Sequence, residues 1–180
     1  MLKFNAMNSL LMRTFCFLGF LIIAQTSFPQ CEIKNRTYPD GSMIYYIEPV
    51  NFYQTKAKSL QGGISTDKEN YYLELLPVPF PEKPEGNKLK DDLDVTLADG
   101  KSYMLKHFDT RYIRKDTVMK MVFLIDKDVL DQFLNFEVID VKINMMGDEG
   151  IRTYVFKLHK SALKEQLECF LKEEEEKKEK

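Results

Sequence analysis

The stretch from residue 117 to residue 158 constrains the fold more than any other part of this chain. Residues 117–125 are almost continuously apolar, broken only by Lys120, which is typical of a central strand covered on both faces. A short helical pattern follows, with Asp126 as its N-terminal cap and Asn135 as its end. Its apolar face consists of Val129, Leu130, Phe133 and Leu134.

Two more strands, at 136–146 and 151–158, are joined by the loop Gly147-Asp148-Glu149-Gly150. A four-residue loop predicts a hairpin whose facing residues match in character. The expected pairs are Ile143 with Tyr154, Val141 with Phe156, Ile139 with Leu158 and Asp140 with Lys157. The apolar positions change parity between Val138 and Ile139, which predicts a β-bulge or a late strand start.

The first thirty residues have the pattern of an export signal. Lys3 and Arg13 supply positive charge, and residues 14–24 form an apolar run. A membrane-spanning helix needs about 20 apolar residues, so this shorter run is typical of a signal peptide. An uncleaved membrane anchor is the alternative. The sequence therefore predicts a secreted or periplasmic protein with no transmembrane span after cleavage.

Cysteine usage fits export. Cys16 lies within the signal, so the mature chain keeps Cys31 and Cys169. Two cysteines in an oxidising compartment predict one disulfide, which would constrain the unfolded chain by about 4–5 kcal/mol. Two separate thiols are one alternative. A lipid anchor at Cys31 is another, although Gln30 lacks the small side chain that a lipoprotein motif places before its cysteine.

Length and charge bound the remaining possibilities. Residues 31–172 are expected to form a single α+β domain, and residues 173–180 a charged, solvated tail. Loss of Lys3 and Arg13 takes the formal charge from −2 to −4, because residues 1–30 contain no acidic residue. Nucleic-acid binding needs clustered Lys and Arg, so no nucleic-acid partner is expected.

Strand patterns also occupy the first half of the mature chain. Residues 32–37 and 42–48 are predicted strands joined by a turn at Pro39-Asp40-Gly41. Both faces of 42–48 are apolar, so we expect this strand to be well covered. Residues 50–70 are an irregular strand or a surface loop, with Gly62-Gly63 as a flexible joint. Residues 71–76 are again a strand.

A proline-rich segment separates the two halves. Prolines at positions 77, 79, 81 and 84 predict an extended surface connector, since neither a helix nor a central strand tolerates that density. Beyond it, a three-residue loop at Ala98-Asp99-Gly100 predicts a hairpin with Val95 opposite Tyr103 and Leu93 opposite Leu105. Residues 107–115 are a polar, aromatic connection to the strand at 117–125.

The chain ends in an amphipathic helix that begins near Ser161. Its apolar stripe consists of Leu163, Leu167, Phe170 and Leu171. Together these patterns predict an α+β fold. A curved, mostly antiparallel sheet of six to eight strands carries the C-terminal helix packed on it, and one short helix lies between strands.

Catalytic chemistry has little support in the sequence. His107, Asp109 and Arg111 are the best candidates for a base and its neighbours, and they make a small periplasmic hydrolase the alternative function. The sequence contains no G-x-S-x-G elbow and no glycine-rich phosphate loop. Clustered Cys and His for zinc are also missing. We therefore expect no enzyme activity, no catalytic residue, no metal and no cofactor.

Aromatic residues crowd the first half of the mature chain. The candidate interaction surface consists of Tyr45, Tyr46, Phe52, Tyr53, Tyr71 and Tyr72. Aromatic side chains bind partners because they combine apolar area with a polar tip. Strands also bury many aromatics, so only the exposed members of this set would form the surface. The sequence favours an exported, non-catalytic protein that binds a protein, peptide or glycan at the bacterial envelope or outside the cell.

Overall fold

A computed structural model describes residues 31–38, 41–81, 91–113, 118–145 and 150–178. The signal-like segment, the turn at positions 39–40 and three of the four predicted loop residues at 147–150 lie outside these ranges. The strands are β1 Lys34–Thr37, β2 Met43–Tyr46, β3 Val50–Gln54, β4 Ser59–Thr66, β5 Tyr71–Val78, β6 Leu93–Leu97, β7 Ser102–Ile113, β8 Val118–Ile125, β9 Val138–Asn144 and β10 Ile151–Val155. The helices are α2 Lys127–Asn135 and α3 Ala162–Lys178.

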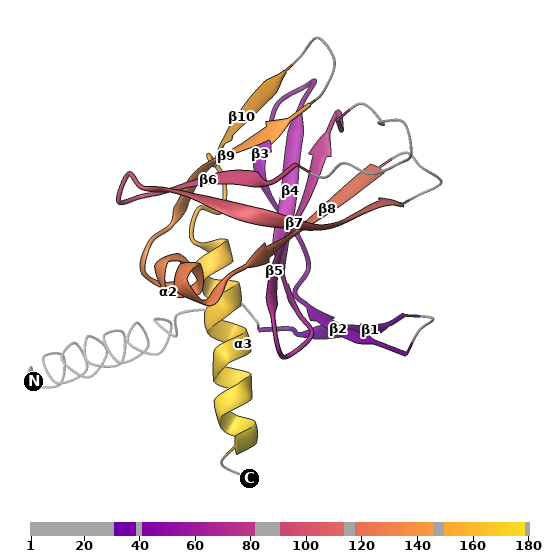
Figure 1. The fold of residues 1–180 in the computed structure, drawn as a ribbon, viewed down its shortest axis with the longest axis vertical. Helices are drawn as coiled ribbons and strands as arrows, with labels where there is room; N and C mark the ends of the chain where they lie inside the picture. Colours follow the sequence, from indigo (N-terminus) through magenta and orange to yellow (C-terminus); the bar gives the residue numbers. More distant parts are fainter. Residues whose placement is uncertain (1–30, 39–40, 82–90, 114–117, 146–149, 179–180) are drawn as a thin grey trace, which may run out of the picture. The chain divides into compact units, whose positions relative to one another are not determined.

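Every strand pair in the described part of the chain is antiparallel, so the predicted α+β class with a mostly antiparallel sheet is confirmed. The strand order is β1-β2-β4-β5-β8-β7-β6-β9-β10, and β3 also pairs with β4 (Figure 1). The sheet stays open. Near β10 it approaches β3, where the Phe52 carbonyl accepts hydrogen bonds from the amides of Lys157 and Leu158 at 2.9 and 3.1 Å.

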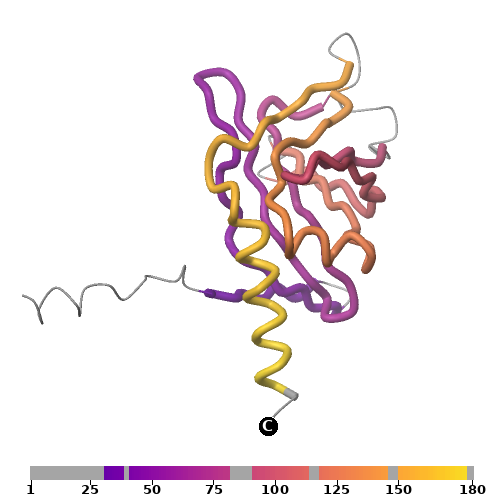
Figure 2. The backbone as a smooth tube through the Cα atoms, turned by 90° about the vertical axis from the view of Figure 1, so that its left-hand side faces the viewer, coloured from indigo at the N-terminus to yellow at the C-terminus, as the bar shows by residue number. Residues whose placement is uncertain are grey.

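Strand alternation gives the sheet one apolar face, which forms the core. Its fully buried side chains include Phe52, Leu60, Leu73, Leu75, Val95, Leu105, Met119, Met121, Val141 and Phe156. Phe52 and Phe156 stack with ring centroids 4.1 Å apart. Helix α3 contacts β4 and α2 (Figure 2). Its predicted stripe is confirmed because Leu163, Leu167 and Phe170 are buried.

The predicted disulfide is present. It joins Cys31, just before β1, to Cys169 in α3, with Cα atoms 5.6 Å apart. The bond uses the sulfur of Cys31 that a lipid anchor would need. A disulfide is compatible with an extracytoplasmic protein, because such bonds persist in oxidising compartments. Among the described helices, none has the length and apolar character needed to cross a membrane.

Three local predictions agree with the structure. In the β6–β7 hairpin, Val95 faces Tyr103 and Leu93 faces Leu105, and Gly100 takes a φ of +84° at the end of the three-residue loop. Helix α2 starts after Asp126 and ends at Asn135 as predicted, although the Asp126 side chain makes no capping hydrogen bond. A register shift in the β6–β9 pairing accounts for the change of parity after Val138, as a bulge would.

The predicted register of the last hairpin is wrong by two residues. Tyr154 faces Val141 rather than Ile143, and Val155 faces Asp140 where Lys157 was expected. The amide of Met145 donates to the Gly150 carbonyl at 2.7 Å, so Gly150 belongs to the pairing rather than to the loop. A shift of two leaves every side chain on its predicted face, which is why alternation alone missed it.

Four further expectations need correction. The count of six to eight strands is too low, because residues 50–70 contain both β3 and β4. Residues 107–113 belong to β7 rather than to a connection, since they pair with β8. Strand β5 continues through Pro77, beyond Leu75 where its pairing with β8 ends. The strand at 42–48 is shorter than expected and only partly covered, with Met43 41% exposed.

Gly62 and Gly63 are buried within β4 and do not form a flexible joint. A Cβ atom at Gly62 would lie 2.5 Å from the backbone oxygen of Glu74 and 2.8 Å from Cδ2 of Leu75. The glycine is therefore required because strand β5 and Phe52 approach β4 so closely, and not because the backbone must bend.

Gly62→Ala should lower the free energy of unfolding by about 1–3 kcal/mol, because the new methyl group overpacks a rigid backbone contact. Urea denaturation followed by circular dichroism measures this change. Gln61→Ala is the matched control on the exposed side of the same strand, and it should change stability by less than about 0.5 kcal/mol. Equal stability of the two variants would contradict the proposed close contact.

Candidate binding cleft

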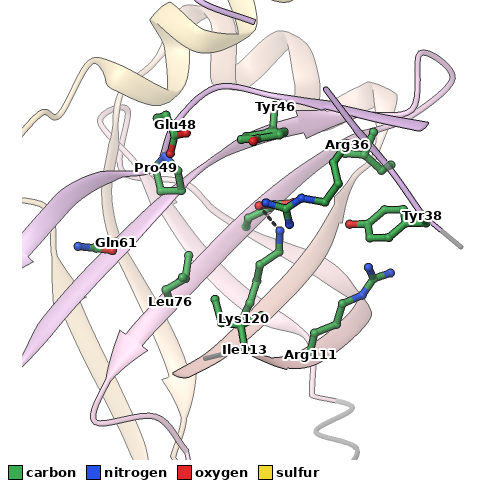
Figure 3. A pocket seen from close by; sticks show the side chains of 12 residues that line it. Arg36, Tyr38, Tyr46, Glu48, Pro49, Gln61, Leu76, Arg111, Ile113 and Lys120 are labelled. Atoms are coloured by element: carbon green, nitrogen blue, oxygen red, sulfur yellow. Dashed lines mark hydrogen bonds and ion pairs between the residues drawn. The ribbon is translucent and has the colours of Figure 1, made fainter. Parts of the chain in front are cut away.

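A cleft of about 270 Å³ lies between the β1–β2 hairpin and the polar face of the central strands (Figure 3). We call it the hairpin cleft. Its lining residues are Arg36, Tyr38, Ile44, Tyr46, Glu48, Pro49, Gln61, Glu74, Leu76, Arg111, Ile113 and Lys120. They come from β1, β2, β4, β5, β7 and β8 and from the segments that flank the hairpin strands.

Strand alternation explains how these distant residues meet. In β5, Glu74 lies between Leu73 and Leu75, which are buried in the core on the other face. In β8, Lys120 lies between the buried Met119 and Met121. The polar residues of both strands therefore point away from the core and toward the hairpin.

A buried ion pair lies at the base of the hairpin cleft. The ammonium of Lys120 is 2.5 Å from Oε2 of Glu74, and the two side chains are only 12% and 9% exposed. The hydroxyl of Ser65 donates to Oε1 of Glu74 at 2.9 Å. Both carboxylate oxygens thus have a donor, so Glu74 and Lys120 satisfy each other and hold β5 and β8 together.

Two arginines and two tyrosines also line the hairpin cleft. The Arg36 guanidinium lies 5.2 Å from the ring centroid of Tyr46, and the Arg111 guanidinium lies 4.3 Å from that of Tyr38. These distances are in the range of cation–π contacts, which orient the planar guanidinium groups against the rings. Figure 3 shows Arg36, Tyr38 and Arg111 on the same side of the cleft.

The charges around the cleft differ in how far they are neutralised. Arg111 forms an ion pair with Asp109. Lys34 pairs with Glu48 at 3.0 Å. Within the described part of the chain, Arg36 forms no ion pair with a carboxylate. An arginine without an ionic partner retains donors that match a carboxylate or another anion in two-point geometry.

The structure divides the predicted aromatic surface. Phe52, Tyr71 and Tyr72 are buried, so they do not belong to a surface. The Tyr71 hydroxyl donates to Glu174 at 2.8 Å, which shows that the predicted solvated tail contacts the sheet at its start. The Tyr72 hydroxyl donates to Asp67 at 2.7 Å. Burial raises the pKa of both phenols, and their carboxylate acceptors raise it further.

The other three aromatic residues are partly exposed, but only Tyr46 lines the hairpin cleft. Tyr45 points to the opposite face of β2, where Lys68 lies 4.7 Å from its ring centroid. Tyr53 packs edge-on against Tyr154 at 5.7 Å. The predictions from sequence left out Arg36 and Lys120, and the predicted aromatic surface did not include Tyr38, which follows β1. The signal for Lys120 was its place between the buried Met119 and Met121. Strand β1 gave no such signal for Arg36, because it contains no apolar residue.

The structure does not assemble the candidate catalytic group. A bulge between His107 and Asp109 places the two side chains on opposite faces, because His107 pairs with Phe123 while Asp109 pairs with Val122. The His107 ring is 2.7 Å from the Thr110 hydroxyl, and burial lowers the pKa of its imidazole. Asp109 instead contacts Arg111 and accepts the amide of Thr110 at 2.9 Å.

Across the described residues, no group of three His, Cys, Asp or Glu side chains is arranged to hold a metal ion. Comparison with known proteins adds no functional information, since no family model, curated protein or solved structure matches the chain.

Proposed function

We propose that this protein is exported and non-catalytic, and that it binds a partner by holding an anionic group in the hairpin cleft. The export signal pattern and the disulfide support a location outside the cytoplasm. The partner belongs to the class predicted from the sequence, a protein, peptide or glycan. The ligand group in this proposal is a carboxylate.

One observation carries the proposal. Arg36 lines the cleft without an ionic partner among the described residues, and Tyr46, Tyr38 and Arg111 surround the same space. The guanidinium is oriented by the Tyr46 ring, so little conformational entropy is lost when a carboxylate binds it. Because the whole chain has a net charge of −2, this local cation is the feature that selects an anionic ligand group.

The size of the cleft limits what it holds. Sites for whole drug-sized ligands have volumes of about 300–1,000 Å³, and this cleft has about 270 Å³. It therefore accommodates one acidic side chain or one acidic sugar unit of a larger partner. A hydrolase that uses His107 and Asp109 is not favoured by any observation, because the bulge separates the two residues.

Arg36→Gln should weaken binding of N-acetylglutamate by about tenfold, the loss expected for a partly exposed charge-assisted contact of about 1.4 kcal/mol. Chemical-shift titration by NMR measures the dissociation constant and maps the site. Lys101→Gln removes the same charge from an exposed side chain outside the cleft, so this control should bind as the wild type does. If the two variants bind equally well, or if the shifts lie away from the cleft, the proposal is wrong.

A further inference from the structure

The strand β1 lies at one end of the sheet. In the described part of the chain it pairs with β2 alone, so its other edge meets no strand. Asn35, Arg36 and Thr37 are exposed along this edge. An exposed edge offers a row of backbone donors and acceptors to an extended chain, the interaction that many peptide-binding domains use.

The pairing pattern identifies the backbone groups that point outward. Tyr38 donates its amide to the Ser42 carbonyl at 2.8 Å, so this pair is hydrogen-bonded. Hydrogen-bonded and non-hydrogen-bonded pairs alternate in an antiparallel ladder, and the pair of Thr37 and Met43 is therefore of the second kind. The same holds for Asn35 and Tyr45. The amide and carbonyl groups of Asn35 and Thr37 point to the unpaired edge.

The side chains of β1 connect this edge to the hairpin cleft. Arg36 lies between Asn35 and Thr37 and points into the cleft, as does Tyr38. A third strand added to the hairpin would present alternate side chains on the same face as Arg36. An acidic residue at such a position would meet Arg36, because opposite charges on neighbouring strands attract.

We propose that the partner is an extended polypeptide segment that adds to β1 as a strand and places a Glu or Asp side chain against Arg36. This inference rests on the proposed function and names its ligand class. An extended backbone matches the spacing of the outward groups of Asn35 and Thr37, and the acidic side chain complements Arg36. A glycan can supply the carboxylate but lacks the regular amide and carbonyl groups that the edge requires.

The probe is the peptide acetyl-Thr-Val-Glu-Val-Thr-amide, measured by calorimetric titration against the wild-type protein. It should bind at least about tenfold more tightly than N-acetylglutamate, because strand hydrogen bonds add to the carboxylate contact. Two N-methylated versions of the peptide form an internal control, because each carries methyl groups on one alternate set of backbone amides. The peptide methylated on the amides that face β1 should bind at least about tenfold more weakly, and the peptide methylated on the other amides should bind normally.

Thr37→Pro tests the protein side, because it removes an outward amide and keeps the extended backbone that proline tolerates at a sheet edge. It should bind the peptide at least about tenfold more weakly and N-acetylglutamate unchanged. Thr153→Pro is the matched control in β10. In the β9–β10 ladder the Met145 amide donates to the Gly150 carbonyl, and the Phe156 amide donates to the Ile139 carbonyl. Because hydrogen-bonded and non-hydrogen-bonded pairs alternate between them, the Thr153 amide also points away from the partner strand. This variant should bind the peptide normally.

The outcomes separate the two proposals. If peptide and N-acetylglutamate bind equally and Thr37→Pro has no effect, strand addition is wrong while the carboxylate site stands. Tighter binding of a galacturonate trimer than of the peptide, lost in Arg36→Gln, overturns the peptide in favour of a glycan. If the peptide binds through β1 but Arg36→Gln changes the affinity for neither the peptide nor N-acetylglutamate, the proposed carboxylate site is wrong. Strand addition to β1 would then still stand.

Discussion

Replacing Cys31 and Cys169 together with serine should lower the free energy of unfolding by about 4 kcal/mol. The disulfide joins residues 138 positions apart, and closing so long a loop removes much of the entropy of the unfolded chain. A loss of this size is a large part of the roughly 5–15 kcal/mol by which a domain is stable. Urea denaturation of the oxidised wild type, the reduced wild type and the double variant at pH 7 measures it.

The cross-link matters locally as well as globally. Strand β1 pairs with β2 alone among the described strands, and β2 pairs with β4 only through Tyr45 with Thr66 and Tyr46 with Ser65. The disulfide also attaches the chain just before β1 to helix α3. Reduced wild type and the double variant should unfold at the same urea concentration. A further effect of dithiothreitol on the variant, or a loss below about 1 kcal/mol, would contradict this account.

Much of the fold could be predicted because apolar alternation was unambiguous where one face is buried. The β6–β7 hairpin is the clearest case: shifting its register by one residue would have moved Leu105 and Tyr103 to the polar face. The stripe on α3 and the strand β8 were equally clear. The disulfide followed from having two cysteines outside the predicted export signal and a predicted oxidising compartment.

The alternation of apolar and polar residues could not distinguish between two structures that place the same side chains on the same face of the sheet. The β9–β10 register differs from the prediction by two residues, and both registers bury the same side chains. Gly62 looked like a joint because glycine permits bending, but here it permits close approach to Glu74 and Leu75. The bulge in β7 is also invisible to composition, although it alone separates His107 from Asp109.

The hairpin cleft was the least predictable part, because it depends on long-range topology. Arg111 in β7 and Lys120 in β8 are cross-strand partners, and Arg36 in β1 lines the same cleft only through the placement of the β1–β2 hairpin. The predicted aromatic surface contained Tyr46 from this site, together with residues that are buried, such as Phe52. Aromatic content therefore led only to Tyr46, while the charged residues that line the cleft lie in both halves of the chain.

The buried pair of Glu74 and Lys120 leads to the second large expected effect. The two side chains are about nine-tenths buried, and Ser65 satisfies the remaining carboxylate oxygen. A buried pair need not stabilise a protein more than apolar residues of equal volume would, since both charges lose their hydration. Removing one partner is different, because it leaves the other charge buried without compensation.

Lys120→Met should therefore lower the free energy of unfolding by about 3–5 kcal/mol at pH 7, because the Glu74 carboxylate keeps only the Ser65 hydroxyl as a donor. The double variant Glu74→Gln/Lys120→Met should be more stable than Lys120→Met alone, since it carries no buried charge. Urea denaturation of the wild type, the two single variants Glu74→Gln and Lys120→Met, and the double variant measures the coupling between the two residues.

Lys142→Met is the matched control, because Lys142 and Asp94 form an exposed pair at 4.0 Å and should contribute less than about 1 kcal/mol. Additive losses across the cycle would show that Glu74 and Lys120 do not depend on each other.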